Sequence, residues 1–136
     1  MKSSNIAVVS LVVSVAFAAV AAEVDISKLP PPSDKKGVTY AADIKPIFEN
    51  SCVKCHSGDR AKAKLHLDTL EGVLKGGEDG KVALPGNSAK SILVHNAARV
   101  GDEDNWMPPK NNKAGIGPLT AEQVGLIRAW IDQGAK

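Results

Sequence analysis

The clearest periodic pattern in the chain lies near its C-terminal end. Thr120, with Gln123 three residues later, forms a capping box, and Gly134 stands where a C-cap glycine belongs. Between them the apolar residues recur at the spacing of one helix face: Val124, Ile127, Trp130 and Ile131. We therefore predict a helix that begins after Thr120 and ends before Gly134.

A shorter pattern of the same kind lies in residues 42–51. Ile44, Ile47 and Phe48 fall on one helix face, and Pro46 is early enough to occupy a first helical turn. We predict a short amphipathic helix here, which ends next to the first cysteine of the chain.

The remaining chain alternates between helical and loop patterns. Residues 88–100 predict a second helix capped by Ser88, and residues 68–74 predict one helical turn. The rest of 59–86 and the whole of 101–117 contain many turn-forming residues, which predicts loops. No useful stretch alternates as a strand does, so we predict an all-α fold.

The N-terminal residues form the most apolar part of the chain. An unbroken apolar run spans residues 6–22 behind Lys2, and small residues at its end precede Glu23. This pattern is typical of a secretory signal peptide, here residues 1–22, and it predicts an exported, periplasmic protein. The run is also close to the length of a membrane span. A retained N-terminal anchor is therefore the alternative, and only then would the protein associate with a membrane.

Residues 23–38 contain three consecutive prolines and mixed charge, which predicts an extended, solvated linker rather than packed structure. We expect the folded domain over residues 39–136, a length that can close one core. The formal charge of the chain is +2, and it falls to +1 when Lys2 leaves with the signal. So small a charge predicts no basic surface for nucleic acid, and nucleic-acid binding is set aside.

The chain has two cysteines, Cys52 and Cys55, and His56 follows them directly. C-x-x-C-H is the attachment signature of c-type haem, because two thiols three positions apart can each add to a haem vinyl group while the histidine projects over the iron. A zinc ribbon needs a second ligand pair, and a thioredoxin-like disulfide needs a preceding strand. The sequence offers neither. We predict one haem c, bound covalently through Cys52 and Cys55, with His56 as proximal ligand.

A six-coordinate haem iron needs a distal ligand, normally Met or His. Met107 is the only methionine that remains after loss of the signal, and Pro108 and Pro109 stiffen the chain behind it. A lone methionine is otherwise a residue that fills core space. His66 and His95 are the rivals for the distal position. We predict Met107 as the distal ligand, His66 as a surface or haem-edge residue, and His95 as solvated or capped.

The stretch from Tyr40 to Ala135 resembles the single-haem c-type cytochrome domain of planctomycetes and verrucomicrobia, which is similar to class I cytochromes c. The resemblance rests on DIKPIF (43–48), CVKCH (52–56), LHLD (65–68), GGEDG (76–80), PGNS (85–88), SIL (91–93), MPP (107–109), LT (119–120) and WIDQGA (130–135). Every c-type cytochrome shares the haem motif, whereas the Gly-Gly, Pro-Gly and Met-Pro-Pro elements in this order are more selective. Such domains often head much larger proteins, and here the domain follows a linker.

The resemblance implies a cytochrome c-like helical domain wrapped around one covalent haem, with Cys52 and Cys55 as thioether sites, His56 proximal and Met107 distal. From the motif and the resemblance we predict an electron carrier rather than an enzyme, which passes one electron at a time between redox partner proteins and acts as a monomer. One alternative is a haem-based sensor or enzyme in which a small ligand displaces Met107. Another is an interaction module whose haem only stabilises the fold.

Further expectations concern contacts around the haem. Phe48 and Trp130 are expected to meet where the first and last helices cross. The second ring N–H of His56 is expected to donate to a backbone carbonyl near Leu84 and Pro85, since a haem ligand needs such support.

Trp106 has two readings of equal weight: it covers a haem edge or donates to a propionate, or it is a partly exposed structural tryptophan. The loop 76–80 lacks the order of a phosphate-binding loop, which excludes nucleotide binding. Basic residues flank the haem motif and are candidates for steering an acidic partner, with a balanced, solvated surface as the alternative: Lys54, Arg60, Lys62 and Lys64.

Overall fold

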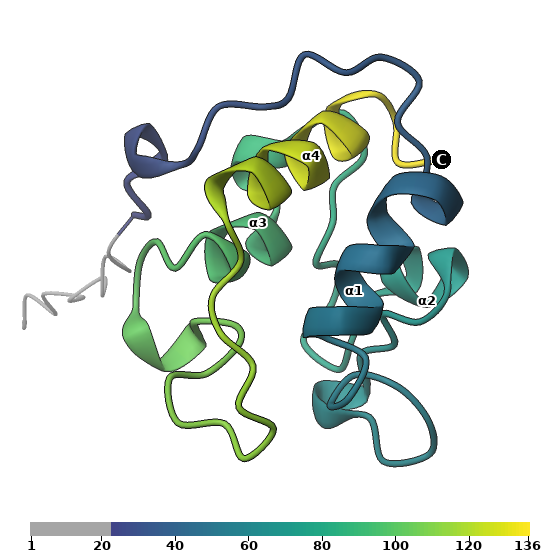
Figure 1. The fold of residues 1–136 in the computed structure, drawn as a ribbon, viewed down its shortest axis with the longest axis vertical. Coiled ribbons are helices and arrows are strands. Elements are labelled where there is room, and N and C mark those ends of the chain that lie inside the picture. Colours follow the sequence, from purple (N-terminus) through teal and green to yellow (C-terminus); the bar gives the residue numbers. More distant parts are fainter. Residues whose placement is uncertain (1–22) are drawn as a thin grey trace, which may run out of the picture.

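The computed structural model describes residues 23–136, and the predicted signal segment 1–22 lies outside the described residues. The described part of the chain contains four α-helices: α1 (Lys45–Ser51), α2 (Leu70–Lys75), α3 (Ile92–Ala97) and α4 (Ala121–Asp132). Short helical turns supplement them, and residues 23–136 contain no strand, so the all-α prediction is confirmed. Helices α3 and α4 contact each other on one side of the molecule, and α1 and α2 lie on the other (Figure 1). No helix within residues 23–136 has both the length and the apolar character needed to cross a membrane.

Helix α4 has the predicted boundaries and caps. The Thr120 side chain accepts from the Gln123 backbone N–H, and the Gln123 side chain accepts from the Thr120 N–H. Gly134 follows the helix at φ +104°, a conformation that only glycine adopts readily. The predicted apolar face is buried at every position: Val124, Ile127, Trp130 and Ile131. This helix therefore supplies one side of the core.

The predicted helix over 88–100 is interrupted at Ser91 and ends at Ala97 rather than at residue 100. A short turn, Ser88–Lys90, is capped by Asn87, and α3 begins only after Ser91. The break has a physical cause, because the buried Ser91 hydroxyl donates to the Asn87 carbonyl and accepts from the Leu84 N–H. Such local bonds hold the backbone outside the helical conformation. Ser88 is not the cap; its N–H and hydroxyl both donate to Asp132 on α4.

The first predicted helix begins two residues early, as a π-helical turn over Tyr40–Ile44 that continues into α1. The Tyr40 ring contacts two other rings. Its centroid lies 6.2 Å from that of Phe48 and 6.0 Å from that of Trp130. Helix α4 accordingly packs on the Tyr40–Ile44 turn. Tyr40 thus contacts both rings, and the expected meeting of Phe48 with Trp130 stays a prediction.

Residues 23–38 are largely extended and most of them are exposed, yet the segment also packs against α4, which the linker prediction did not include. The segment runs along the outer side of α4 (Figure 1), and Leu29 and Val38 are buried at 7% and 4% exposure. The Ser33 N–H donates to the Gly125 carbonyl at 2.9 Å, and Arg128 donates to the Pro30 carbonyl. The backbone of the segment therefore finds hydrogen-bond partners on α4, which compensates the loss of water around it.

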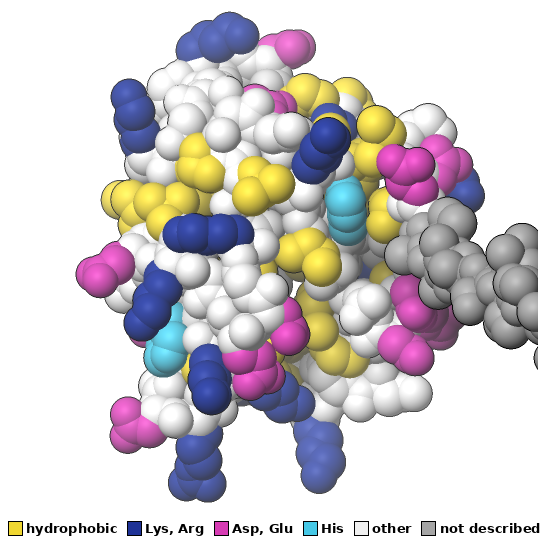
Figure 2. Space-filling view, turned by 180° about the vertical axis from the view of Figure 1, so that it is seen from behind, with side chains coloured by type: hydrophobic (Ala, Val, Ile, Leu, Met, Phe, Trp, Pro, Cys, Tyr) yellow, Lys and Arg dark blue, Asp and Glu magenta, His cyan; other side chains and the backbone are white. Residues whose placement is uncertain are grey.

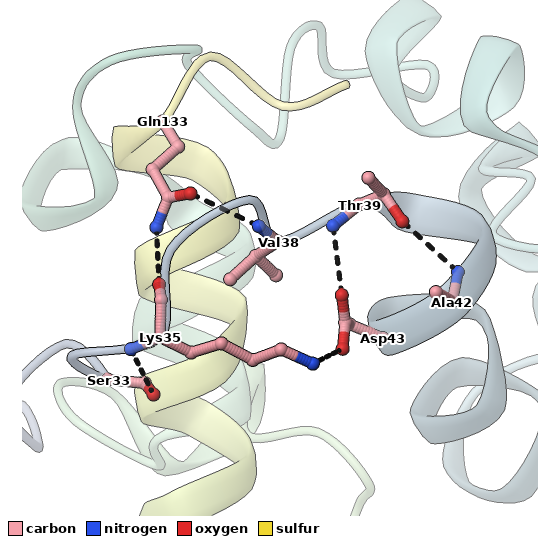
Figure 3. Close-up of polar contacts among 7 residues, drawn as sticks. All are labelled: Ser33, Lys35, Val38, Thr39, Ala42, Asp43 and Gln133. Atoms are coloured by element: carbon pink, nitrogen blue, oxygen red, sulfur yellow. Dashed lines mark hydrogen bonds and ion pairs between the residues drawn. The ribbon is translucent and has the colours of Figure 1, made fainter.

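The end of this segment is joined to both α4 and the first helical turn. Gln133 donates to the Lys35 carbonyl at 2.7 Å and accepts from the Val38 N–H at 3.1 Å (Figure 3). Lys35 pairs with Asp43, which also accepts from the Thr39 N–H. One glutamine and one aspartate thus connect the segment to two helices that are distant in sequence.

Gly125 offers a test of this docking. A Cβ at position 125 would lie 2.7 Å from the Pro31 carbonyl oxygen and 3.5 Å from the Ser33 nitrogen. Gly125→Ala should therefore destabilise the protein by about 1–3 kcal/mol, as overpacking does. Urea unfolding, with Gly117→Ala as the matched control, measures the effect, because a Cβ at Gly117 meets nothing within 4 Å. Equal unfolding midpoints for the two variants would show that the segment does not dock on α4.

Candidate functional site

An apolar cavity of about 380 Å³ lies between the segment after α1 and the loop after α3. This volume falls within the usual range of ligand pockets. Cys52, Cys55 and His56 line one wall and Met107 lines another, so the structure brings together all four predicted site residues. Ile92, also in the lining, remains 47% exposed, which places the cavity at the surface. Figure 2 shows hydrophobic side chains around a hollow in the middle of one face, with basic side chains along its left and lower edges.

The turn that follows α1 brings the two cysteines and the histidine together. Cys52 is the C-cap of α1, and its N–H donates to the Phe48 carbonyl at 2.8 Å. The N–H groups of Cys55 and His56 then both donate to the Cys52 carbonyl, at 3.1 Å and 3.0 Å. This single tight turn presents three side chains to the same cavity.

His56 is oriented by a backbone carbonyl. Its Nδ1 lies 3.1 Å from the Lys62 carbonyl oxygen, and since a carbonyl only accepts, Nδ1 carries the proton. The expected position near Leu84 and Pro85 is therefore wrong. Burial lowers the pKa of His56, which favours the neutral ring. Nε2 is left with a free lone pair, as a metal ligand requires.

The wall that holds Met107 belongs to the long loop between α3 and α4. The Met107 N–H donates to the Asn96 carbonyl on α3 at 3.0 Å, which ties the start of this segment to the helix. Pro108 and Pro109 follow, and both line the cavity with Met107. The thioether therefore lies in a segment that is fixed to α3 at one end.

Comparison with known proteins agrees with this geometry. Residues 52–111 match the family model described as "Planctomycete cytochrome C", a stretch that runs from the first cysteine past Met107. This match supports a planctomycete-type cytochrome c domain within the chain. The resemblance noted from the sequence is thus confirmed, and it implies a haem-binding, electron-transfer role. No curated protein and no solved structure shows a significant match.

The donor set of the cytochrome domain fits haem c, the group that the family implies. It comprises two cysteines outside any disulfide, a neutral histidine with Nε2 available, and a thioether, all lining one largely apolar cavity. Within residues 23–136 no three Cys, His, Asp or Glu side chains form a cluster able to hold a metal ion, so the zinc alternative gains no support.

The Cys52 thiol is kept in its protonated form. Burial raises the pKa of Cys52 to about 12, because a thiolate is poorly stabilised there. Oxidation and disulfide exchange proceed through the thiolate. Before haem attachment, the Cys52 thiol is therefore harder to deprotonate than an ordinary cysteine.

The rival histidines are held away from the cavity lining. His95 Nε2 donates to the Ala89 carbonyl at 2.7 Å, so its ring is capped, as one reading expected. His66 is nearly half exposed, with its Nδ1 at 3.9 Å from Asp68. Neither residue lines the cavity, whereas Met107 does. The geometry therefore favours Met107 over either histidine.

The glycine pair of loop 76–80 has a packing role. A Cβ on Gly77 would lie 2.6 Å from the Ala63 carbonyl oxygen, and one on Gly76, at φ +85°, would lie 2.2 Å from the Gly80 oxygen. The loop also bonds to this neighbouring segment, through the Glu78 N–H and the Ala63 carbonyl at 2.8 Å. Close approach of two backbones thus closes one side of the cavity, which explains the glycines without a bound phosphate.

The contacts of Trp106 favour the interpretation of a partly exposed structural tryptophan. Its indole N–H donates to the Gly101 carbonyl at 3.2 Å, and it does not line the cavity. Lys110 Nζ lies 4.9 Å from its ring centroid, within range of a cation–π contact. Trp106 therefore organises the loop beside the cavity.

Sequence reasoning missed Tyr40, whose hydroxyl donates to the Leu67 carbonyl at 2.8 Å. Leu67 lines the cavity, and its N–H donates to the His56 carbonyl at 2.8 Å. Tyr40 thus supports the histidine wall from behind. The only signal was that Tyr40 is the one tyrosine in a chain with few aromatic residues.

Tyr40 should titrate late. Burial raises its pKa from 10.0 to about 12. The neutral phenol is thus favoured more in the folded than in the unfolded chain, so its stabilising contribution holds below pH 10 and is lost as the pH rises towards 12. In an ultraviolet titration, with Tyr40→Phe as the blank, tyrosinate absorbance should appear only near pH 12. A rise centred on pH 10 in the folded protein would contradict this buried environment.

Proposed function

We propose that the protein is an exported single-haem c-type cytochrome that carries one electron at a time between redox partner proteins. The observation that carries the proposal is the convergence of Cys52, Cys55, His56 and Met107 on one cavity. Bound there, haem c supplies an iron that alternates between ferrous and ferric states. Because this one-electron chemistry belongs to the haem, we propose a carrier rather than an enzyme.

The chain contributes attachment, orientation and exclusion of water. Cys52 and Cys55 are proposed as the two thioether sites, since one tight turn presents both to the cavity. His56 is proposed to coordinate through Nε2, because Nδ1 is committed to the Lys62 carbonyl. Met107 is proposed as the opposite ligand. Apolar side chains such as Phe48 and Ile127 exclude water from the site and so help set the potential.

Partners and location follow from the surface and the N-terminal pattern. Lys54, Arg60, Lys62 and Lys64 are exposed beside the haem motif, which supports docking of acidic redox partners. Asp59 lies among them, so the charge is not uniform. We propose a periplasmic monomer released from its signal peptide. N-terminal sequencing of the exported protein distinguishes cleavage from a retained anchor.

Attachment is tested by mass. The mature protein, expressed with a functioning haem-attachment system, should carry one haem that survives acid extraction, because thioethers are stable to acid. Cys52→Ala and Cys55→Ala should each retain at most one thioether and lose acid-stable haem in part. Protein recovered at the apo mass with a Cys52–Cys55 disulfide would contradict the proposal.

Axial ligation is tested by spectroscopy. A thioether bound to ferric iron should give a weak far-red band at roughly 695 nm. Met107→Ala should abolish this band, lower the reduction potential and admit carbon monoxide to the ferrous protein. His66→Ala and His95→Ala serve as controls and should leave all three properties nearly unchanged. Rapid carbon monoxide binding by the unmutated protein would instead favour the sensor or enzyme alternative.

A further inference from the structure

The segment Met107–Pro108–Pro109 has few ways to be held in place. Prolines lack a backbone N–H, so after the Met107 N–H the segment has no donor of its own until Lys110. Its fixed points must then be the carbonyl oxygens of Pro108 and Pro109, which need donors from elsewhere. Two side chains supply them.

Arg99 supplies the first donor. Its Nη2 donates to the Pro108 carbonyl at 2.6 Å, a charge-assisted hydrogen bond. Arg99 itself sits at φ +55°, a conformation that non-glycine residues adopt at an energetic cost, and its Nε is buried without a partner. The guanidinium carbon also lies 6.0 Å from the Trp106 ring centroid. The positive φ belongs to the turn that ends α3, in which the Val100 N–H donates to the His95 carbonyl at 3.0 Å. This turn directs the Arg99 guanidinium to the Pro108 carbonyl.

Asn112 supplies the second donor. Its Nδ2 donates to the Pro109 carbonyl at 2.8 Å and to the Ile116 carbonyl at 2.7 Å, and its Oδ1 accepts from the Ile116 N–H at 2.9 Å. Pro109, Asn112 and Ile116 all line the cavity. One amide therefore joins the far end of the Met107 segment to the return of the loop towards α4.

We propose that Arg99 and Asn112 are positioning residues. Their hydrogen bonds to the carbonyls of Pro108 and Pro109 set how readily Met107 leaves the iron. The inference rests on the proposed role of Met107 as distal ligand. Both side chains act through hydrogen bonds to the backbone that carries the thioether. Loss of either hydrogen bond raises the fraction of time for which Met107 is detached and the sixth coordination site of the iron is open.

The test uses the holoprotein and carbon monoxide as the probe. Carbon monoxide binds the ferrous protein only after Met107 leaves, so its observed binding rate reports ligand release. Loss of one charge-assisted or amide hydrogen bond should raise that rate by roughly tenfold in Arg99→Gln and several-fold in Asn112→Asp. Asn112→Asp retains the acceptor for the Ile116 N–H but loses both donated bonds. In both variants the far-red ferric band should weaken.

The controls match charge and chemistry within the same loop. Lys113→Gln removes one positive charge, and Asn111→Asp adds one negative charge at an exposed neighbour, so both correct for charge effects on the iron. Both should keep the carbon monoxide rate and the far-red band of the unmutated protein. Far-ultraviolet circular dichroism checks that each variant is folded. If Asn112→Asp does not fold, Arg99→Gln decides alone, because it removes a single donated bond.

The outcomes separate this inference from the proposed function. A far-red band that Met107→Ala leaves intact overturns the ligand assignment, and the positioning role with it. A band that Met107→Ala abolishes, combined with unchanged carbon monoxide rates in folded Arg99→Gln and Asn112→Asp, overturns only the positioning role. Faster binding in these two variants but not in their controls supports it.

Discussion

The apolar cavity between the Cys52–His56 turn and Met107 is the constraint on which the rest of the structure depends. Protein interiors are close-packed, and a small domain that keeps such a space open needs an apolar occupant to complete its core. The large side chains lie behind this space rather than in it. Phe48 lines the cavity and contacts Tyr40, which in turn contacts Trp130. The aromatic cluster thus forms a rigid wall, and bound haem would supply the apolar volume in front of it.

The N-terminal segment 23–38 has a related structural role on the opposite side of α4. Helix α4 faces the cavity through Ile127, while the Gly125 carbonyl accepts from the segment outside. The segment packed on the outer side of α4 restricts the motion of this helix, whose inner side lines the cavity. Gln133 binds the same segment to the end of α4, and Asp43 binds it to the first helical turn, so the elements on both sides of the cavity are connected without crossing it.

Much of the fold was predictable where the determinants are local. The caps and apolar face of α4 depend on residues within one helix, and the Cys52–His56 motif depends on a single turn; both were predicted. The packing of 23–38 was not, because prolines predict extension but contain no information about which helix accepts the chain. The helix break at Ser91 was missed because a serine that bonds to the preceding loop looks, in sequence, like any helical serine.

The partner of His56 shows the same limit at the site. A backbone carbonyl is chemically identical at every residue, so nothing in the sequence distinguishes Lys62 from Leu84 or Pro85 as its source. Only the path of the chain, with the loop after the motif folded back on the ring, decides this. By contrast, the prediction of Met107 over the histidines rested only on composition and the neighbouring prolines, and the structure places Met107, but neither histidine, in the cavity lining. Side-chain chemistry was therefore readable, whereas backbone partners depended on the tertiary fold.

The two prolines after Met107 affect both the position of a side chain and the hydrogen bonds of its backbone. They reduce the conformational freedom of the segment, which favours a preorganised thioether, but they also remove the N–H groups by which a loop is usually held. The segment is instead held by the carbonyls of the two prolines, which accept hydrogen bonds from Arg99 and Asn112. A neutral thioether is a weak ligand by itself, so its hold on an iron depends strongly on the backbone that carries it. Residues outside direct contact with the ligand thereby become part of what separates an electron carrier from a protein that admits small molecules to its iron.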